Sequence, residues 1–393
     1  MTKRVELLAP AGDLERLKIS LLYGADAVYI GGQDYSLRAN ANNFSIEEIK
    51  EACLFAHNLN KKVYLTLNIV FHNEDLENVN SFIKEVVDAG IDAFIVSDPF
   101  IIKYIKDNFD VEVHLSTQGS TTNVESVKYW KNEGVDRVVL AREVSIKEIE
   151  EIYKETHLDL EVFIHGAMRT FYSGRCCLSN YFTNRDSNRG GCAQICRFAF
   201  DIEDSDTKFT LATKDLNMAS ILDRLISTGV KSLKVEGRMR SFYYIATVIS
   251  TYREAIDDYY NNKLTDNKIK YYTKILNRVA NRESTDHFFN KKTSKREQYF
   301  SGRKEESNQD FLGIILDYNE KEKTVTLTQR NYFKKGSKVE IFGPNIKTFS
   351  FTIPEIYDED NNIIEVANHP EQIVKFKLNK KVYKDNIMRV KIN

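Results

Sequence analysis

The sequence predicts an α/β protein: a (β/α)8, TIM-like barrel followed by a small β-barrel domain. Four segments of the chain are alike, and each has a glycine, a short turn and a run of apolar residues; they begin at Gly24, Gly90, Gly134 and Gly229. The glycine suits the left-handed position that ends a helix, and the apolar run suits a strand that is covered on both faces. Further strand candidates lie between these copies, so strands and helices alternate over roughly 260 residues, which favours a parallel sheet.

The eight expected strands follow one another with a helical pattern after each. The helix after the second strand opens with a capping box at Ser45, and the last helix covers about residues 241–261. Eight units favour closure into a barrel. The alternative is a Rossmann-like open sheet, but no Gly-x-Gly-x-x-Gly follows the first strand. The strands are expected at residues 5–11, 24–32, 62–69, 90–98, 112–118, 134–142, 161–166 and 229–237.

One connection, residues 167–211 after the seventh strand, is too long for an ordinary barrel loop and contains four cysteines. Loops of this length in a compact domain are usually functional, and this one leaves the end of the barrel where such enzymes keep their active sites. We therefore place the barrel at residues 1–262. We expect a basic linker at 263–310 and, from alternating segments bounded by turn residues, a small β-barrel at 311–393.

Composition and charge indicate an ordinary globular protein. The chain has 42% hydrophobic and 29% charged residues and a net charge of -1, so its overall field does not attract nucleic acid. The start of the chain has no secretory pattern and no apolar run is long enough to span a membrane, so we expect a cytoplasmic protein without structural disulfides.

A basic stretch lies at residues 263–304. It contains twelve Lys or Arg residues but four Asp or Glu residues, with aromatic residues between them. Either this stretch is solvated surface, or its cations contact RNA phosphates and its rings stack on bases. For the second interpretation the candidate phosphate contacts are Lys291, Lys292, Lys295 and Arg296.

Polar residues at the C-terminal ends of the predicted strands should point toward one mouth of the barrel. Its cations suit a small anionic carboxylate, because guanidinium groups match carboxylates well. Among these residues His165 is a lone histidine outside any zinc motif, and packing explains it better than catalysis. No Gly-x-Ser-x-Gly motif indicates a serine hydrolase. The catalytic candidates are Arg38, Asn68, Asp98, His165 and Glu236, and the substrate-binding candidates are Arg142, Lys214, Arg238 and Gln118.

The strongest local signal is the cysteine cluster of the long loop: Cys176, Cys177, Cys192 and Cys196. Thiolates ligate zinc and iron-sulfur clusters. Because the spacing is not that of a zinc ribbon, an iron-sulfur cluster is the favoured ligand. The alternative is that these cysteines are small packed side chains without a metal.

Several stretches of the chain resemble one family. They are residues 161–181, which include His165-Gly-Ala-Met-Arg169, residues 184–197, and the shorter segments 6–12, 37–44 and 233–244. Together they resemble the signature of peptidase family U32, whose members are called collagenase-like. Within that family the chain is most similar to the tRNA hydroxylation branch.

This resemblance implies an enzyme that forms 5-hydroxyuridine at the wobble position of tRNA, with prephenate as co-substrate and with an iron-sulfur cluster. It also implies tRNA as a partner, together with a paralogous partner subunit. The alternatives are a collagenase-like peptidase and a non-catalytic partner without a cluster. The family usually has a cysteine where this sequence has Arg169, which leaves Cys176, Cys192 and Cys196 as the thiols of its pattern, with Cys177 as an extra neighbour.

Overall fold

The computed structural model describes residues 4–37, 43–170, 175–201, 203, 208–280, 282–290, 293–299 and 308–392. The chain forms two compact units, Met1–Glu305 and Glu306–Asn393. Each unit is described by itself.

The first unit contains a closed barrel of parallel strands. Within the described ranges, eight strands pair side by side, and the last of them pairs with both the first and the seventh, so the sheet closes. The prediction of a (β/α)8 barrel is therefore confirmed, and the open Rossmann-like sheet is excluded. The barrel strands are β1 (Glu6–Pro10), β2 (Ala27–Gly31), β3 (Lys62–Leu67), β4 (Ala93–Val96), β5 (Glu112–Leu115), β6 (Arg137–Val139), β7 (Asp159–Gly166) and β9 (Ser232–Val235).

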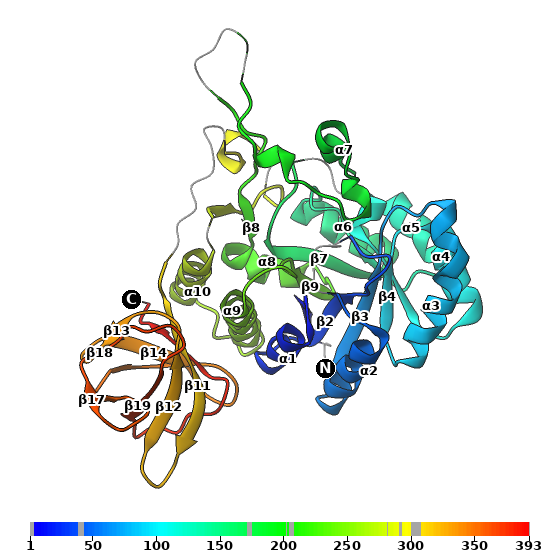
Figure 1. The fold of residues 1–393 in the computed structure, drawn as a ribbon. Helices are drawn as coiled ribbons and strands as arrows, with labels where there is room; N and C mark the ends of the chain where they lie inside the picture. The colour runs from blue at the N-terminus through cyan, green and yellow to red at the C-terminus, as the bar shows by residue number, and fades with distance from the viewer. Residues whose placement is uncertain are drawn as a thin grey trace. The chain divides into compact units, whose positions relative to one another are not determined.

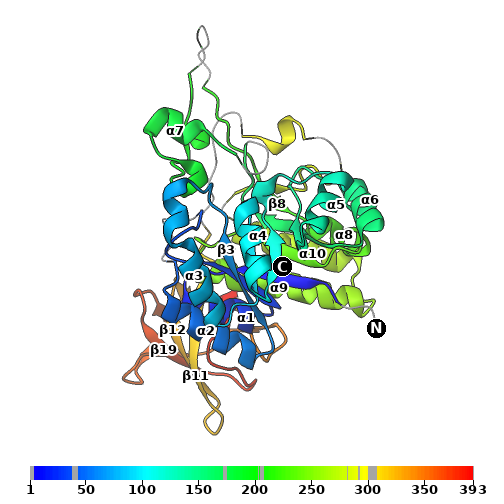
Figure 2. The same cartoon turned by 90° about the vertical axis from the view of Figure 1, so that its right-hand side faces the viewer.

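Helices surround the strands, as Figures 1 and 2 show. The predicted capping box at Ser45 is present, because its hydroxyl accepts a hydrogen bond from the Glu48 amide and the Glu48 carboxylate accepts one from the Ser45 amide. The helices between and after the barrel strands are α1 (Leu14–Leu22), α2 (Ile46–Asn58), α3 (Leu76–Asp88), α4 (Pro99–Asn108), α5 (Val124–Asn132), α6 (Ile146–Thr156), α8 (Leu222–Ser227) and α9 (Phe242–Tyr260).

The long connection between β7 and α8 forms an insertion that carries the cysteines. It contains α7 (Leu178–Thr183) and ends in β8 (Asp215–Asn217), which pairs antiparallel with the end of β7. In Figure 1 the insertion, drawn in green, extends from one end of the barrel. The cysteines therefore lie at the C-terminal end of the barrel strands, as predicted.

The segment that we expected to be a basic linker contains folded structure of the first unit. Helix α10 (Asp266–Val279) packs against α9 through a buried apolar face, and β10 (Ser284–Thr285) pairs with β8. The apolar residues of α10 recur at helical spacing between the lysines and arginines, at Tyr272, Ile275, Leu276 and Val279. Residues 263–299 therefore belong to the barrel unit.

The second unit is an antiparallel β domain with its own apolar core, which includes Leu327, Val339, Ile341 and Phe376. In β12 the burial alternates along the strand, so one face packs on this core. The strands are β11 (Phe311–Asn319), β12 (Thr324–Gln329), β13 (Phe333–Lys334), β14 (Lys338–Phe342), β15 (Phe349–Thr352), β16 (Ile356–Tyr357), β17 (Ile363–Ile364), β18 (Val366–Ala367), β19 (Ile373–Lys377) and β20 (Ile387–Val390). Across both units, none of the described helices has the length and apolar character needed to cross a membrane.

A network of buried charges lies among the barrel strands. Arg137 Nη1 is 2.7 Å from Glu6 Oε1 and 3.2 Å from Glu161 Oε2, and Lys234 Nζ is 2.8 Å from Glu161 Oε1. Burial opposes ionisation of Glu161, but Lys234 and Arg137 outweigh it and lower its pKa to about 2. The network links β1, β6, β7 and β9 through ionised side chains.

Candidate functional site at the mouth of the barrel

Three cavities adjoin at the C-terminal end of the barrel strands, and Arg142 and Arg169 line all three. The barrel cavity, between the strand ends, has a volume of about 50 Å³. The thiol cavity, under the insertion, has a volume of about 150 Å³. The rim cavity, which Phe288 also lines, has a volume of about 300 Å³. The two shared arginines make these cavities parts of one site.

The barrel cavity brings together five residues that the sequence nominated. They follow four different strands, β3, β5, β6 and β9, and their convergence follows from closure of the barrel. They are Asn68, Gln118, Arg142, Glu236 and Arg238.

Hydrogen bonds and close packing fix these side chains. Arg238 Nη2 donates to Ser36 Oγ at 2.8 Å, and the guanidinium fits because position 31 is a glycine, where a Cβ would overlap Arg238. Tyr29 donates its hydroxyl to Glu236 Oε2 at 3.1 Å. The barrel cavity therefore combines a carboxylate with four cationic side chains, which are Arg142, Arg169, Lys234 and Arg238.

A second wall of the barrel cavity carries neutral amides. Asn68 Nδ2 donates to Ser116 Oγ at 3.3 Å. In the described part of the chain, the buried atoms Asn68 Oδ1 and Gln118 Oε1 have no hydrogen-bond partner. Buried polar atoms are normally satisfied, so this wall is suited to a polar ligand.

His165 does not lie in the mouth. It is buried against α9, with its Nδ1 3.3 Å from the hydroxyl of Tyr252. Burial, with a further contribution from Arg240, lowers its pKa to about 3, so the ring is neutral near pH 7. The packing interpretation is correct for His165, and its inclusion among the catalytic candidates was wrong.

The other nominated residues are placed differently from the prediction. Asp98 is the N-cap of α4 and accepts hydrogen bonds from two amides of the first turn, so it has a structural role. Lys214 pairs with Glu283 and lines none of the three cavities, so the expected convergence of Arg142, Lys214 and Arg238 holds only for the two arginines. Arg38 lies outside the described residues.

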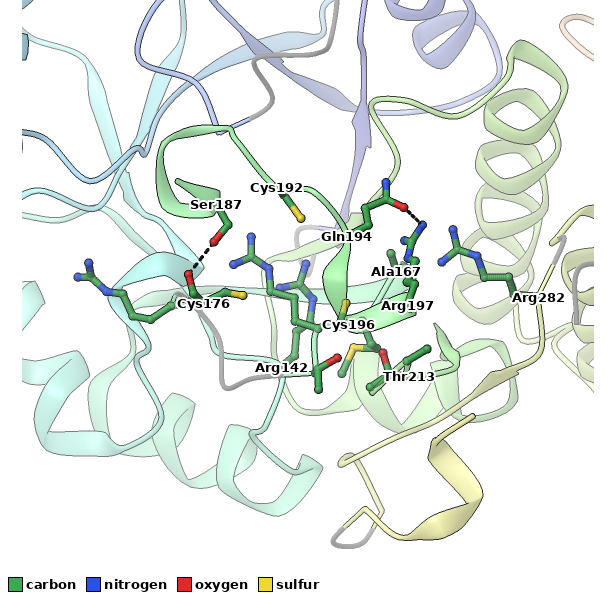
Figure 3. Close-up of a pocket in the computed structure, with 15 residues that line it drawn as sticks. Arg142, Ala167, Cys176, Ser187, Cys192, Gln194, Cys196, Arg197, Thr213 and Arg282 are labelled. Atoms are coloured by element: carbon green, nitrogen blue, oxygen red, sulfur yellow. Dashed lines mark hydrogen bonds between the residues drawn. The ribbon is translucent and has the colours of Figure 1, made fainter. Parts of the chain in front are cut away.

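Three of the four clustered cysteines line the thiol cavity. Figure 3 shows the sulfur atoms of Cys176, Cys192 and Cys196 around a common space. Cys177 is exposed and does not line this cavity, so the structure does not support it as a fourth ligand. Burial raises the pKa of the Cys196 thiol, and the nearby Cys192 and Cys176 contribute to the increase.

Hydrogen bonds hold the cysteine segment in place. The main-chain carbonyl of Cys176 accepts from Ser187 Oγ at 2.6 Å and from Asn188 Nδ2 at 3.0 Å. Arg189 anchors the segment to the barrel, because its guanidinium pairs with Asp75 and donates to the carbonyl of Val70 at 2.9 Å. The thiols are thus presented by a loop that is tied to the barrel.

Arginines dominate the charge of the thiol cavity. Five of them line it, and Arg197 and Arg282 lie on the side seen at the right of Figure 3. Burial and the charge of Arg282 lower the pKa of Arg197. An anion in this space would offset the repulsion between these cations. The full set is Arg142, Arg169, Arg175, Arg197 and Arg282.

The donor set fits an iron-sulfur cluster better than a single metal ion. No three His, Cys, Asp or Glu side chains of the described ranges are grouped closely enough to hold one ion. A cluster is wider than an ion, so its ligands stand farther apart, and three thiols around one arginine-lined cavity match its preference for thiolates.

Sequence reasoning missed several cavity residues. Arg169 was noticed only as a departure from the family pattern, but it lines every cavity of the site. Lys234 lies inside β9, and its ammonium group is 4.4 Å from the ring centroid of Tyr29. The signal that could have identified the loop arginines was their density around the cysteines, at Arg169, Arg175 and Arg197.

Of the four residues nominated for RNA contact, Lys295 and Arg296 are exposed on a short 3-10 helix (Lys295–Glu297). Lys291 and Lys292 lie outside the described residues. The strand-like residue Gln298, two positions beyond Arg296, lines the rim cavity. The two exposed cations therefore lie next in sequence to one wall of the site.

Fold and site together define a (β/α)8-barrel protein whose mouth is lined by thiols and arginines. Residues 12–299 match the model of Peptidase family U32, and residues 307–389 match that of its C-terminal domain. The chain belongs to this family.

Curated relatives align with most of the chain. The chain is 48% identical to tRNA hydroxylation protein P1 of Bacillus subtilis, over 99% of this chain and 95% of that protein. It is 32% identical to tRNA hydroxylation protein P of Escherichia coli, over 92% of this chain and 91% of that protein. A Porphyromonas gingivalis protein named collagenase is 34% identical, over 72% of this chain and 73% of that protein.

Replacing Arg142 with methionine should weaken binding of a small dicarboxylate such as prephenate at least tenfold. Arg142 lies 3.7 Å above the ring of Phe163 and lines the barrel cavity, and one lost charge-assisted hydrogen bond costs about 1.5–3 kcal/mol. Isothermal titration calorimetry measures the affinity. The matched control is Lys214→Met, which removes a cation outside the cavities and should leave the affinity unchanged. Equal losses in both variants would contradict a carboxylate site in the barrel cavity.

Proposed function

We propose that this protein is an enzyme of tRNA modification that hydroxylates the wobble uridine to 5-hydroxyuridine. In this proposal prephenate is the co-substrate, and an iron-sulfur cluster is held by Cys176, Cys192 and Cys196. The observation that supports the proposal is the junction of three cavities at Arg142 and Arg169, because three thiols line one of them and cationic side chains line the adjoining one.

The relatives support the RNA substrate. The match to a protein named for tRNA hydroxylation extends over nearly the whole chain, including the C-terminal β domain. A further relative is named a 23S rRNA 5-hydroxycytidine synthase, a name that describes hydroxylation of an RNA pyrimidine at its 5-position. Both names describe hydroxylation of RNA, which needs the RNA and an oxygen source in one site.

The chain's own residues have distinct tasks in this proposal. Arg142 and Arg238 bind the carboxylates of the co-substrate, and the amides of Asn68 and Gln118 orient its polar groups. Glu236, fixed by the Tyr29 hydroxyl, can accept a proton at its carboxylate. Bound between the three thiols, an iron-sulfur cluster would supply redox chemistry.

A peptidase activity has less support from this site. His287 is the histidine that lines the rim cavity, and its Nε2 is bonded to the main-chain carbonyl of Lys214 at 2.9 Å. Within the described residues, no hydrogen bond joins this ring to a serine or cysteine side chain, the contact by which a base activates such a nucleophile. Among the residues that the structure describes around this site, the collagenase name of one relative is therefore not matched by a nucleophile bonded to the histidine of the rim cavity.

Nucleoside mass spectrometry of tRNA tests the proposed function. In a host strain without this protein and its homologues, 5-hydroxyuridine should disappear, and the wild-type gene should restore it. Cys176→Ser should fail to restore it, whereas Cys177→Ser, the adjacent cysteine outside the cavity, should succeed. Unchanged tRNA nucleosides in the deletion strain would refute the function, and equal restoration by both variants would refute the role of the thiol cavity.

A further inference from the structure

The rim cavity is the largest of the three cavities at the mouth, and the proposed chemistry leaves it unassigned. Its volume of about 300 Å³ is well above that of the barrel cavity. Arg142 and Arg169 line it as they line the other two cavities, so whatever occupies it lies beside both.

The walls of the rim cavity come from two segments that are far apart in the sequence. Thr213, at the end of the cysteine insertion, forms a β-bridge with Gln298. The Lys214 amide donates to the Glu297 carbonyl at 3.0 Å, and the Tyr299 amide donates to the Ala212 carbonyl at 2.9 Å. These main-chain bonds give the cavity a preformed wall.

The lining of the rim cavity suits an uncharged aromatic ring with polar edges. Phe288 offers a ring for stacking, and Thr213 and Gln298 offer neutral polar groups. Glu143 also lines this cavity, and its carboxylate disfavours a free carboxylate ligand there. The cations of the rim cavity are the shared Arg142 and Arg169, whereas the barrel cavity has Lys234 and Arg238 in addition.

Cations outside the rim cavity match a phosphate backbone. Lys295 and Arg296 are exposed on the 3-10 helix that directly precedes Gln298. A stacked base flanked by cations is the arrangement by which proteins bind unpaired nucleotides.

We propose that the rim cavity receives the base of one unpaired RNA nucleotide, stacked on Phe288, while Lys295 and Arg296 contact the adjacent phosphates. This inference rests on the proposed function, because the base would then meet the co-substrate at Arg142 and Arg169. It identifies the rim cavity as the entrance for the target nucleotide and the barrel cavity as the co-substrate site.

Photo-crosslinking and binding assays with the full chain test this assignment. The probe is a fluorescent stem-loop RNA with 4-thiouridine at the wobble position of its seven-nucleotide loop. Irradiation should attach it to the peptide that contains Phe288 or to the one that contains Thr213, as peptide mass spectrometry would show. Attachment only to the C-terminal domain or to α7 would overturn the proposal.

Matched variants give a second measurement. Phe288→Leu should weaken binding of the stem-loop about tenfold, within the range of one lost base stack, and should have no effect on a stem-loop that is abasic at the wobble position. Phe100→Leu, which changes an exposed ring on α4, is the control and should bind like the wild type. Equal losses for the intact and the abasic RNA would overturn the stacking role.

Arg296→Ala should weaken binding of both RNAs alike and lower the slope of log affinity against log salt by about one unit. An unchanged slope would remove Arg296 from the RNA contact. Neither assay needs the cluster or the co-substrate. If deletion of the gene abolishes 5-hydroxyuridine but the crosslink to the rim cavity fails, the proposed function stands and the assignment of the rim cavity is refuted. Circular dichroism confirms folding of each variant.

Discussion

The variant Arg137→Met should lose about 3–5 kcal/mol of unfolding free energy, the usual cost of removing one partner from a buried ion pair. Arg137 is only 4% exposed at its side chain and contacts both Glu6 and Glu161, so its loss leaves Glu6 without its cation and Glu161 with Lys234 alone. Methionine retains much of the apolar volume, which limits the contribution of a cavity. Urea unfolding followed by circular dichroism measures the change.

The control for this variant is Lys128→Met, which makes the same kind of change in the exposed pair between Lys128 and Glu125. Exposed pairs contribute little, so the unfolding midpoint should barely move. A similar small change for Arg137→Met would show that the barrel does not depend on the buried network.

The effect of Arg137→Met should also depend on pH. The pKa of Glu161 is lowered from its ordinary value of 4.5 to about 2 in the folded protein, and that of Glu6 is lowered as well. A lowered carboxyl pKa contributes stability that is complete above the unfolded pKa and is lost as the pH falls through the folded pKa. The difference in stability between wild type and variant should therefore shrink between about pH 4.5 and pH 2. A difference that stays constant over this range would argue against ionised partners.

The barrel could be predicted from sequence because each unit repeats the same local signals. A glycine such as Gly90 ends a helix with a positive φ, and the apolar strand that follows is buried on both faces. The elements that were missed lack these signals. Strand β8 has only three residues, which is too short for a clear pattern. In α10 the apolar residues of the buried face are separated by lysines and arginines, so the basic composition of the segment hid their helical spacing.

The sequence predicted those residues of the candidate site whose positions follow directly from the ends of the barrel strands. Asn68, Gln118 and Arg142 were found because closure of the barrel brings the ends of parallel strands together. His165 was misplaced because the pairing of β7 with β9 shifts register between Phe163 and His165. Such an irregularity reverses the face of the sheet on which the following side chain lies, and no residue type in the sequence indicates that it is present.

Arg169 could not be placed from the sequence because its position depends on how the insertion folds back over the barrel. In the structure it lines the thiol cavity together with Cys176, Cys192 and Cys196. Arg169 stands where the family usually has a cysteine. A thiol at this position would therefore lie in the same cavity as the other three thiols. This placement allows a direct test of whether the thiol cavity holds the proposed cluster.

Protein purified without oxygen should contain iron and sulfide in nearly equal amounts and should absorb visible light, and Cys192→Ser should lose most of both. Three thiols around one cavity supply the ligands, so removing one leaves too few for stable binding. The matched control Cys177→Ser changes an exposed thiol outside the cavity and should retain the iron.

Arg169→Cys should increase the iron content above that of the wild type, because it adds a thiol to the cavity and removes a cation that an added metal would have to approach. Iron and sulfide assays with the visible spectrum report this without any activity measurement. If wild type and Arg169→Cys are both colourless and free of iron, the thiol cavity holds no cluster, and the chain then acts as a partner subunit without its own cofactor. If only Arg169→Cys holds iron, the arginine is what prevents cluster binding in this chain, since the three remaining thiols are the same in both proteins.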